Sequence, residues 1–300
     1  MSTLLTENFA DLLDARFRRI YDREYKASVD ESMVPMIFGM ESSSRNYEKV
    51  SGVGGMSTIP VFDGSITYDT IKQLYDKEFS FPEYASGIKI ERKLYDDELF
   101  SVMKRQPWQL AHSVADTRED IGADIFNNAF TGTSGPDSKP FCSASHPYSP
   151  DDATTQSNAG STAISAAAIE AIRVIGRNAI YNDRGRLFRV NYDTILCTVS
   201  KEEVAWEIIN SKGQVNTANN NRNFHEGRYK LAVWDKLTDS NNWFMMDSRL
   251  AKMFLLWWDR IKPEFKMDSD TDTLVAKWYT YFRCSAGWAD WRCVYGSNVS

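Results

Sequence analysis

The nine-residue stretch PFCSASHPY, residues 140–148, carries the side-chain types that nucleophilic catalysis uses. Cys142, Ser145 and His146 lie within five positions of one another. A thiol or hydroxyl becomes an effective nucleophile when an adjacent imidazole takes its proton. The stretch therefore raises the hypothesis of a cytosolic hydrolase that uses Cys142 or Ser145 with His146.

The prolines around these residues argue against a catalytic pair. Side chains four positions apart meet on a helix, but Pro140 and Pro147 push the residue before each of them toward an extended backbone. Catalytic cysteine and histidine side chains usually come from separate parts of a chain. We therefore expect no catalysis here, and predict that His146–Pro147 is a structural turn whose imidazole anchors a loop through hydrogen bonds.

The composition is that of an ordinary globular protein. The 300 residues suffice for about two domains, with 42% hydrophobic and 25% charged residues. A net charge of -6 argues against a dedicated nucleic-acid binder, which needs clustered Lys and Arg. The longest apolar run, 253–258, is too short to cross a bilayer, and residues 1–13 do not have the pattern of a secretory signal. We expect a protein that is made in the cytosol and does not associate with membranes.

Three further motifs predict no ligand site. The four cysteines contain no CxxC pair, so we expect free thiols and no metal. The GVGG at 52–55 lacks the spacing of a phosphate-binding loop. The DSDTDT at 268–273 lacks the glycine and the glutamate that a calcium loop needs. The sequence thus predicts no catalytic, cofactor-binding or metal-binding residue.

The first part of the chain combines two helices with an extended segment. Helical periodicity predicts helices over 4–27 and 107–130. Residues 46–92 have the pattern of a polar, Gly-rich loop followed by short strands at TIPVF (58–62) and SGIKIERKL (86–94). This segment has too few large apolar residues to build a core. We predict that it packs on another surface, such as a second subunit.

The central part is predicted to contain a polar loop and two capped helices. The loop covers 149–162, and Ser165 caps the helix that follows it. A buried strand, DTILCTVS, precedes a second helix, where Ser200 and Glu203 have the spacing of a capping box.

The last part is predicted to be rich in strands. Strands are expected at YKLAVW (229–234) and NWFMMD (242–247), and a strand or buried helix at 248–261. Alternation of apolar and polar residues predicts a C-terminal hairpin, with Cys284 opposite Cys293 as reduced neighbours.

One run of residues from Gly135 to Ile172 resembles the major capsid proteins of tailed phages, particularly the Mu-like head-subunit group. It reads GPDSKPFCSASHPYSP, then SNAG, then ISAAAIEAI. The residues in matching places are Pro140, Phe141, His146, Pro147, Ser157 and Asn158. Cys142 stands where the family tends to have serine. Three later stretches continue the resemblance: YDTILCTVSKEEVAWEIINS, GRYKLAVWDKLTDSNNWFMMD and FRCSAGWADWRCVYGS, although the usual Pro-Pro after the first strand is absent. Before the run, an acidic YDDELF (95–100) after an extended segment, followed by a long helix, also fits, so the resemblance covers residues 40–300.

The resemblance implies an α+β fold of the Hong-Kong-ninety-seven type. Its parts would be an N-terminal arm (1–45), an extended loop (46–92), a peripheral domain with a long spine helix (93–150 and 263–300) and an axial domain (151–262). It implies a non-enzymatic coat subunit that assembles into the pentamers and hexamers of an icosahedral head around double-stranded DNA. A minor head or tail-tube subunit is the other phage component to consider, although an inserted axial region disfavours a tube protein.

The same resemblance implies the protein's partners and location. The chain would bind copies of itself, with portal, scaffolding and decoration proteins as further partners and DNA in non-specific proximity only. It would need no cofactor and would reside in the virion after assembly in the bacterial cytoplasm.

Overall fold

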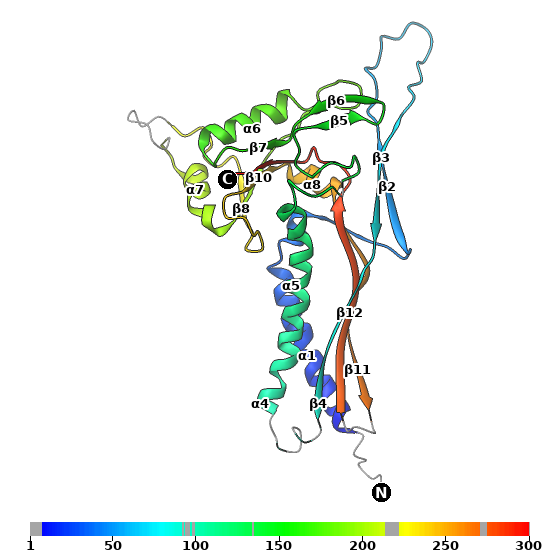
Figure 1. The fold of residues 1–300 in the computed structure, drawn as a ribbon, viewed down its shortest axis with the longest axis vertical. Helices are drawn as coiled ribbons and strands as arrows, with labels where there is room; N and C mark the ends of the chain where they lie inside the picture. The colour runs from blue at the N-terminus through cyan, green and yellow to red at the C-terminus, as the bar shows by residue number, and fades with distance from the viewer. Residues whose placement is uncertain are drawn as a thin grey trace.

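The protein, described here by a computed structural model, is elongated (Figure 1). The structure describes residues 8–91, 93, 97, 100–133, 135–213, 222–270 and 275–299. A long lower part holds two helices and a sheet, and a broader upper part holds shorter helices and the C-terminal end. A β-hairpin lies beside both parts, and its loop extends past the upper part.

Two long helices and a four-stranded sheet form the lower part. Helices α1 (Asn8–Asp30) and α5 (Arg105–Asn127) lie along a sheet of strand order β1-β11-β12-β4. Strand β1 runs parallel to β11, and the other neighbours are antiparallel. The remaining bounds in this part are β1 (Gly39–Ser42), β4 (Glu83–Glu91), β11 (Leu255–Asp270), β12 (Val275–Trp288), α2 (Val34–Ile37) and α4 (Phe100–Met103).

The two predicted long helices are confirmed, with shifted ends. The helix predicted at 107–130 is α5, in which Pro107 occupies the first turn and Leu110 and Val114 are buried. The helix predicted at 4–27 is α1, which continues to Asp30; residues 4–7 lie outside the described residues. Both helices are amphipathic, so one face of each packs on the apolar side of the sheet.

Aromatic side chains join α1 to the sheet. The rings of Phe17 and Trp278 meet edge to face, with centroids 4.8 Å apart. The hydroxyl groups of Tyr21 and Thr280 are 3.1 Å apart, and burial raises the pKa of Tyr21 to about 12. Along β12 the residues at 278, 280, 282 and 284 are all buried, as their alternation predicts.

A buried ion pair joins α5 to β11. Arg118 donates two hydrogen bonds to the carboxylate of Asp259, at 2.8 and 3.2 Å. The guanidinium lies 4.7 Å from the ring centroid of Trp257, whose indole N–H also donates to Asp259. Such a paired and hydrogen-bonded charge is tolerated inside a protein because each ion is compensated.

Strand β11 is irregular where the two hydrophobic clusters of the molecule meet. Its pairing with β12 shifts between Asp259 and Ile261, and again between Ile261 and Glu264. Pro263 lies in this stretch and has no N–H to donate to the ladder. Trp257, before the irregularity, belongs to the upper cluster, and Phe265, after it, belongs to the lower one.

The upper part is built on a five-stranded sheet of order β7-β13-β10-β8-β9. Its strands are β7 (Ala159–Gly160), β8 (Thr194–Cys197), β9 (Lys230–Val233), β10 (Trp243–Met246) and β13 (Val294–Ser297). The accompanying elements are α6 (Ala166–Asn178), α7 (Val199–Asn210), α8 (Ser248–Phe254) and the hairpin of β5 (His146–Ser149) with β6 (Asp152–Gln156). The predicted strands at 229–234 and 242–247 are thus confirmed as β9 and β10.

Of the two predicted helix caps, one is confirmed and one is wrong. Ser165 accepts a hydrogen bond from the backbone N–H of Ala168 at 3.2 Å and caps α6. The helix with the predicted capping box instead begins after Thr198, so Ser200 lies inside its first turn. Thr198 makes no side-chain cap, and its hydroxyl donates to the carbonyl of Ser240.

The predicted C-terminal hairpin is wrong. Strand β12 pairs with β11 and β4, whereas β13 leaves for the other sheet and pairs with β10 and β7. Cys284 therefore lies opposite Asp259, not opposite Cys293. Alternation identifies the buried face of a strand but not its partner, because the same pattern suits any strand that covers the same core.

Two loops and one strand were also predicted wrongly. The polar stretch before Gly54 forms strand β2 (Tyr47–Val53), and the polar loop at 149–162 contains β6 and β7. The predicted strand at 58–62 has no regular secondary structure. Backbone pairing thus extends into polar segments, which composition alone assigns to loops.

The division into domains stays a prediction, but one strand crosses a boundary and another pairs outside the part assigned to it. Strand β11 begins at Leu255, so the boundary at 262/263 falls inside it. Strand β13, assigned to the peripheral part, pairs within the upper sheet.

Cys284 lies in β12 of the lower sheet, whereas Cys293 directly precedes β13 of the upper sheet, and both are buried. We therefore expect no disulfide between them. The thermal melting temperature should be the same with and without dithiothreitol, and a non-reducing gel should show one unshifted band. A melting temperature that falls on reduction would contradict the strand pairing that keeps Cys284 and Cys293 apart.

Candidate functional site

Among the described residues, the large apolar side chains with the greatest exposure lie in the loop of the β2–β3 hairpin. Strand β2 pairs antiparallel with β3 (Gln73–Ser80), and residues 54–72 connect them. This connection is the loop that extends past the upper part in Figure 1. Eight large apolar side chains between residues 53 and 71 are exposed: Val53, Met56, Ile59, Val61, Phe62, Ile66, Tyr68 and Ile71.

The degree of exposure is highest in the middle of this loop. Ile59, Val61 and Tyr68 are 92%, 93% and 87% exposed. Single exposed apolar residues are common on soluble proteins, but a continuous group of them marks an interaction surface. The sequence prediction that 46–92 cannot build a core fits this exposure, although β4, at its end, packs in the lower sheet.

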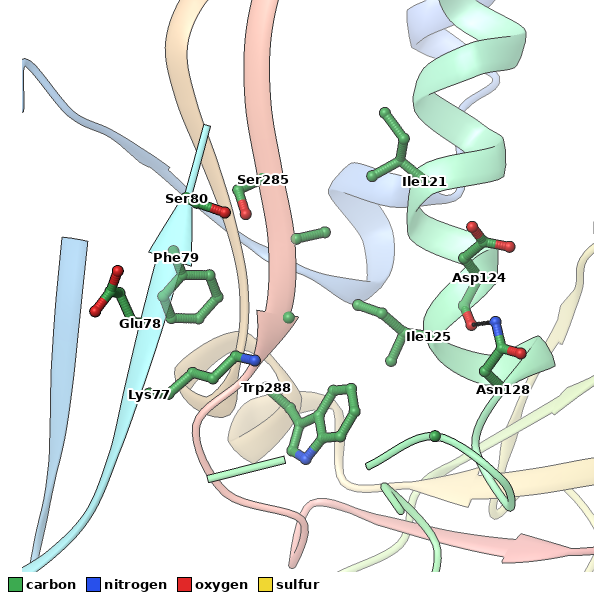
Figure 2. Close-up of a pocket in the computed structure, with 13 residues that line it drawn as sticks. Lys77, Glu78, Phe79, Ser80, Ile121, Asp124, Ile125, Asn128, Ser285 and Trp288 are labelled. Carbon is green, nitrogen blue, oxygen red and sulfur yellow. Dashed lines mark hydrogen bonds between the residues drawn. The ribbon is translucent and has the colours of Figure 1, made fainter. Parts of the chain in front are cut away.

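The base of the hairpin rests on the body through β3. Figure 2 shows a pocket of about 340 Å³ between β3, the end of α5 and the end of β12. The Lys77 ammonium lies 5.7 Å from the ring centroid of Trp288 and 5.9 Å from that of Phe79. Burial lowers the pKa of Lys77. These contacts hold β3 against the body and leave the loop beyond it uncovered.

His146 is fully buried and both of its ring nitrogens are hydrogen-bonded. Nδ1 lies 2.6 Å from the carboxylate of Asp137, and Nε2 lies 3.1 Å from the side-chain oxygen of Asn158. The ring stacks on Trp291, with centroids 4.3 Å apart and planes 8° apart. The prediction that the imidazole anchors a loop through hydrogen bonds is confirmed, but His146 begins strand β5 and is not in a turn.

Asn158 connects this cluster to three backbone groups in two segments of the chain. Its amide nitrogen donates to the carbonyls of Phe141 and Val294, both at 2.9 Å, and its side-chain oxygen accepts from the N–H of Ser143 at 2.8 Å. All polar atoms of a buried amide must be satisfied, because each unsatisfied group costs about 1–3 kcal/mol. Asn158 therefore fixes the PFCSASHPY stretch to the C-terminal strand.

Cys142 is buried in the core beside β13. A Cβ atom on Gly296 would lie 2.6 Å from its sulfur. Burial raises the pKa of the Cys142 thiol far above its ordinary range. Since the His146 nitrogens bond to Asp137 and Asn158, the structure does not bring together the residues of the hydrolase hypothesis, Cys142 or Ser145 with His146, as a proton-transfer pair.

Sequence reasoning missed the roles of Asp137 and Asn158. Both are nearby in the chain, 9 and 12 positions from His146. Asn158 entered only as a matching position in the resemblance. Polar residues in a predicted loop are expected to be in contact with solvent. A buried histidine needs a hydrogen-bond partner for each ring nitrogen, and this requirement is the signal that could have pointed to Asp137 and Asn158.

Within the described part of the chain, no three His, Cys, Asp or Glu side chains are grouped as a metal site requires. No described helix has both the length and the apolar character needed to span a membrane.

The fold is similar to those of phage capsid structures. Neither a family model nor a curated protein matches the sequence. Solved structures do match: the capsid of an empty GTA particle (14% identity, 90% of both chains, TM-score 0.51), the procapsid of bacteriophage JBD30 (12%, 96% of this chain and 76% of that one, 0.53) and Microbacterium phage Oxtober96 (8%, 90% of both, 0.56). The chain has the fold of a phage coat protein. The predicted α+β coat fold of the Hong-Kong-ninety-seven type is confirmed at this level, and the Mu-like group stays a prediction.

Replacing His146 should destabilise the coat fold strongly. His146→Ala leaves the buried carboxylate of Asp137 without its partner, which costs about 3–5 kcal/mol when one member of a buried pair is removed. Urea unfolding followed by tryptophan fluorescence measures the loss. As a control, His112→Ala removes a half-exposed ring and should cost under about 1 kcal/mol. Equal unfolding midpoints for the two variants would show that the His146 cluster contributes little.

The Cys142 thiol should not react in the folded protein. Iodoacetamide at pH 8 should leave Cys142 unmodified until the chain is unfolded, because the thiol is buried and protonated. A Ser65→Cys variant, with the new thiol on the exposed loop, is the positive control and should be labelled rapidly. Peptide mass spectrometry locates the label. Rapid labelling of Cys142 in the folded chain would restore the hydrolase hypothesis.

Proposed function

We propose that this chain is the major capsid subunit of a tailed phage and assembles into pentamers and hexamers of an icosahedral head around double-stranded DNA. The observation that carries the proposal is the exposed apolar loop at 54–72 on a chain with a phage coat fold. In a shell, the loop would be covered by a neighbouring subunit. The described part of the single chain leaves these side chains exposed.

Burial of this short loop against a neighbour would supply a large free energy of association. Complete burial of one Val, Ile or Phe side chain contributes about 1.5–3 kcal/mol. Ile59, Val61 and Phe62 together would therefore contribute several kcal/mol to each contact. A shell repeats the contact in every subunit, so moderate pairwise affinity gives a stable assembly.

The proposal includes the predicted division of the chain. Residues 1–45 would be the N-terminal arm, 46–92 the extended loop, 93–150 with 263–300 the peripheral domain, and 151–262 the axial domain, with α5 as the spine helix. The strand bounds support moving 255–262 to the peripheral part and 294–297 to the axial part.

The partners and the location are proposed with it. The subunit would bind copies of itself, a portal and a scaffolding protein, and decoration proteins where present. Its net charge of -6 suits an inner wall that does not trap packaged DNA. It would have no catalytic, cofactor or metal site, would assemble in the bacterial cytoplasm and would reside in the virion.

Assembly of the purified chain tests the proposal directly. We expect closed shells by negative-stain electron microscopy and a fast-sedimenting species by ultracentrifugation, with scaffolding protein added if the chain alone stays monomeric. A chain that stays monomeric under all these conditions would contradict the proposal.

A loop variant tests whether the exposed apolar residues carry the contact. The triple variant Ile59→Ser, Val61→Ser, Phe62→Ser should fold normally by circular dichroism and form few or no particles, because it removes apolar area without adding charge. The matched control, Thr58→Ser with Thr67→Ser, changes the same loop and should assemble as the wild type does. Normal assembly of the triple variant would show that the loop is not an interface.

A further inference from the structure

A tight turn of the upper part lies against the neck of the exposed loop. We define the neck as residues 54–57 and 69–72, where the chain leaves and re-enters the hairpin. The turn covers 182–186, and the bridge between Tyr181 and Leu187 closes it. The side-chain oxygen of Asn182 accepts from the N–H groups of Arg184 and Arg186, at 3.0 and 2.9 Å. The backbone around Arg184 is therefore fixed by bonds within the turn, independently of its contacts with the neck.

Arg184 bonds to both strands of the neck at once. Its guanidinium donates to the carbonyl of Gly55 at 2.8 Å, to the hydroxyl of Ser57 at 2.8 Å and to the carbonyl of Thr70 at 2.6 Å. It also pairs with the carboxylate of Asp69 at 3.1 Å. A planar guanidinium can serve several acceptors in one orientation, which a lysine ammonium does less well.

The neck approaches the turn closely because two of its residues, Gly54 and Gly55, have no side chain. The N–H of Gly55 donates to the Asp183 carboxylate at 2.7 Å. A Cβ atom on Gly54 would lie 2.6 Å from the second oxygen of Asp183, and one on Gly55 would collide with the amide nitrogen of Asn182. The GVGG stretch, which has no phosphate-loop spacing, thus has a packing role. Two independent features, the arginine and the glycine pair, fit the neck to the turn.

The turn is the main polar attachment of the neck to the body. Arg186 adds one long bond to the carbonyl of Met56, at 3.4 Å, and Lys72 pairs with Asp151 at 3.1 Å on an exposed surface. Beyond the neck, residues 58–68 are exposed. The direction in which this part of the loop leaves the body is therefore set where Arg184 holds the neck.

We propose that Arg184 is a positioning residue for assembly, which fixes the direction of the apolar loop so that the loop meets a second copy of the chain in one geometry. This inference rests on the proposed capsid function. Arg184 need not touch the neighbouring subunit. Its effect is to lower the entropy that the loop loses on docking, because a loop held in its bound direction has less freedom to give up.

Hydrogen exchange of the unassembled chain, isolated by size exclusion, tests the attachment. In Arg184→Ala, the amides of Gly55 and Ser57 should exchange on the order of tenfold faster or more, as expected for a locally opened segment. The amides of β10 and β12 should keep their wild-type rates, which separates loss of attachment from general destabilisation. Arg186→Ala, in the same turn and with the same loss of charge, is the matched control and should exchange at nearly the wild-type rate.

Two further variants keep the test decisive if Arg184→Ala folds poorly. Arg184→Lys keeps the charge near Asp69 but loses the separate guanidinium N–H groups that donate to two carbonyls. The neck amides of this variant should therefore exchange at an intermediate rate. Gly55→Ala should also speed exchange, because the added methyl group displaces Asn182. Wild-type neck exchange in both variants would overturn the proposal.

The same variants in an assembly assay separate this inference from the proposed function. If the wild type forms shells, Arg184→Ala should need an at least about tenfold higher concentration to form them or should form irregular particles, since each 1.4 kcal/mol of docking free energy is a factor of ten in the docking constant. Normal shells from Arg184→Ala would overturn the positioning role and leave the capsid function intact. A wild type that forms no shells, together with fast neck exchange in Arg184→Ala, would reject the capsid function while retaining the attachment.

Discussion

The exposed apolar loop is the constraint on which the rest of the structure depends. A chain that keeps Ile59, Val61 and Phe62 in water gains nothing from them as a monomer, and it risks non-specific aggregation. Such a surface is useful only if the body holds it in place and a defined partner covers it. The long helices, the paired sheets and the buried polar contacts supply that rigid body.

Buried polar groups make the body rigid at two separate places. The Arg118–Asp259 pair connects helix α5 to β11, and the Asn158 cluster connects the PFCSASHPY stretch to the C-terminal strand. Both sites depend on complementary geometry, since a buried charge or amide that loses its partner is costly. They therefore favour one arrangement of the chain over others of similar hydrophobic content.

How much of the structure could be predicted depends on how far apart along the chain the interacting residues lie. The helix α5 and the Ser165 cap depend on residues within a turn or two of one another, and both were predicted. The partner of β12 is decided by contacts with a strand that precedes it and with β4, which is nearly 200 positions away, so alternation around Cys284 suggested the wrong hairpin. The motif order gave the coat fold, which no local rule could have supplied.

The same dependence on separation along the chain holds for the candidate site. That 46–92 does not build a core of its own was predicted from the sequence, but the role of Arg184 depends on contacts 114 to 129 positions away. The cluster around His146 was closer in sequence, yet its two partners lie in stretches that look like solvated loops. Long-range contacts between polar residues leave no periodic pattern, and so they require a structure.

The irregularity around Pro263 shapes the ribbon that β11 forms with β12. A bulge interrupts the ladder, and at that point it bends the strand and increases its twist. Before the break at 259–264, Trp257 packs in one hydrophobic cluster, and after it Phe265 packs in the other. One continuous pair of strands thus contributes to two cores without a loop between them.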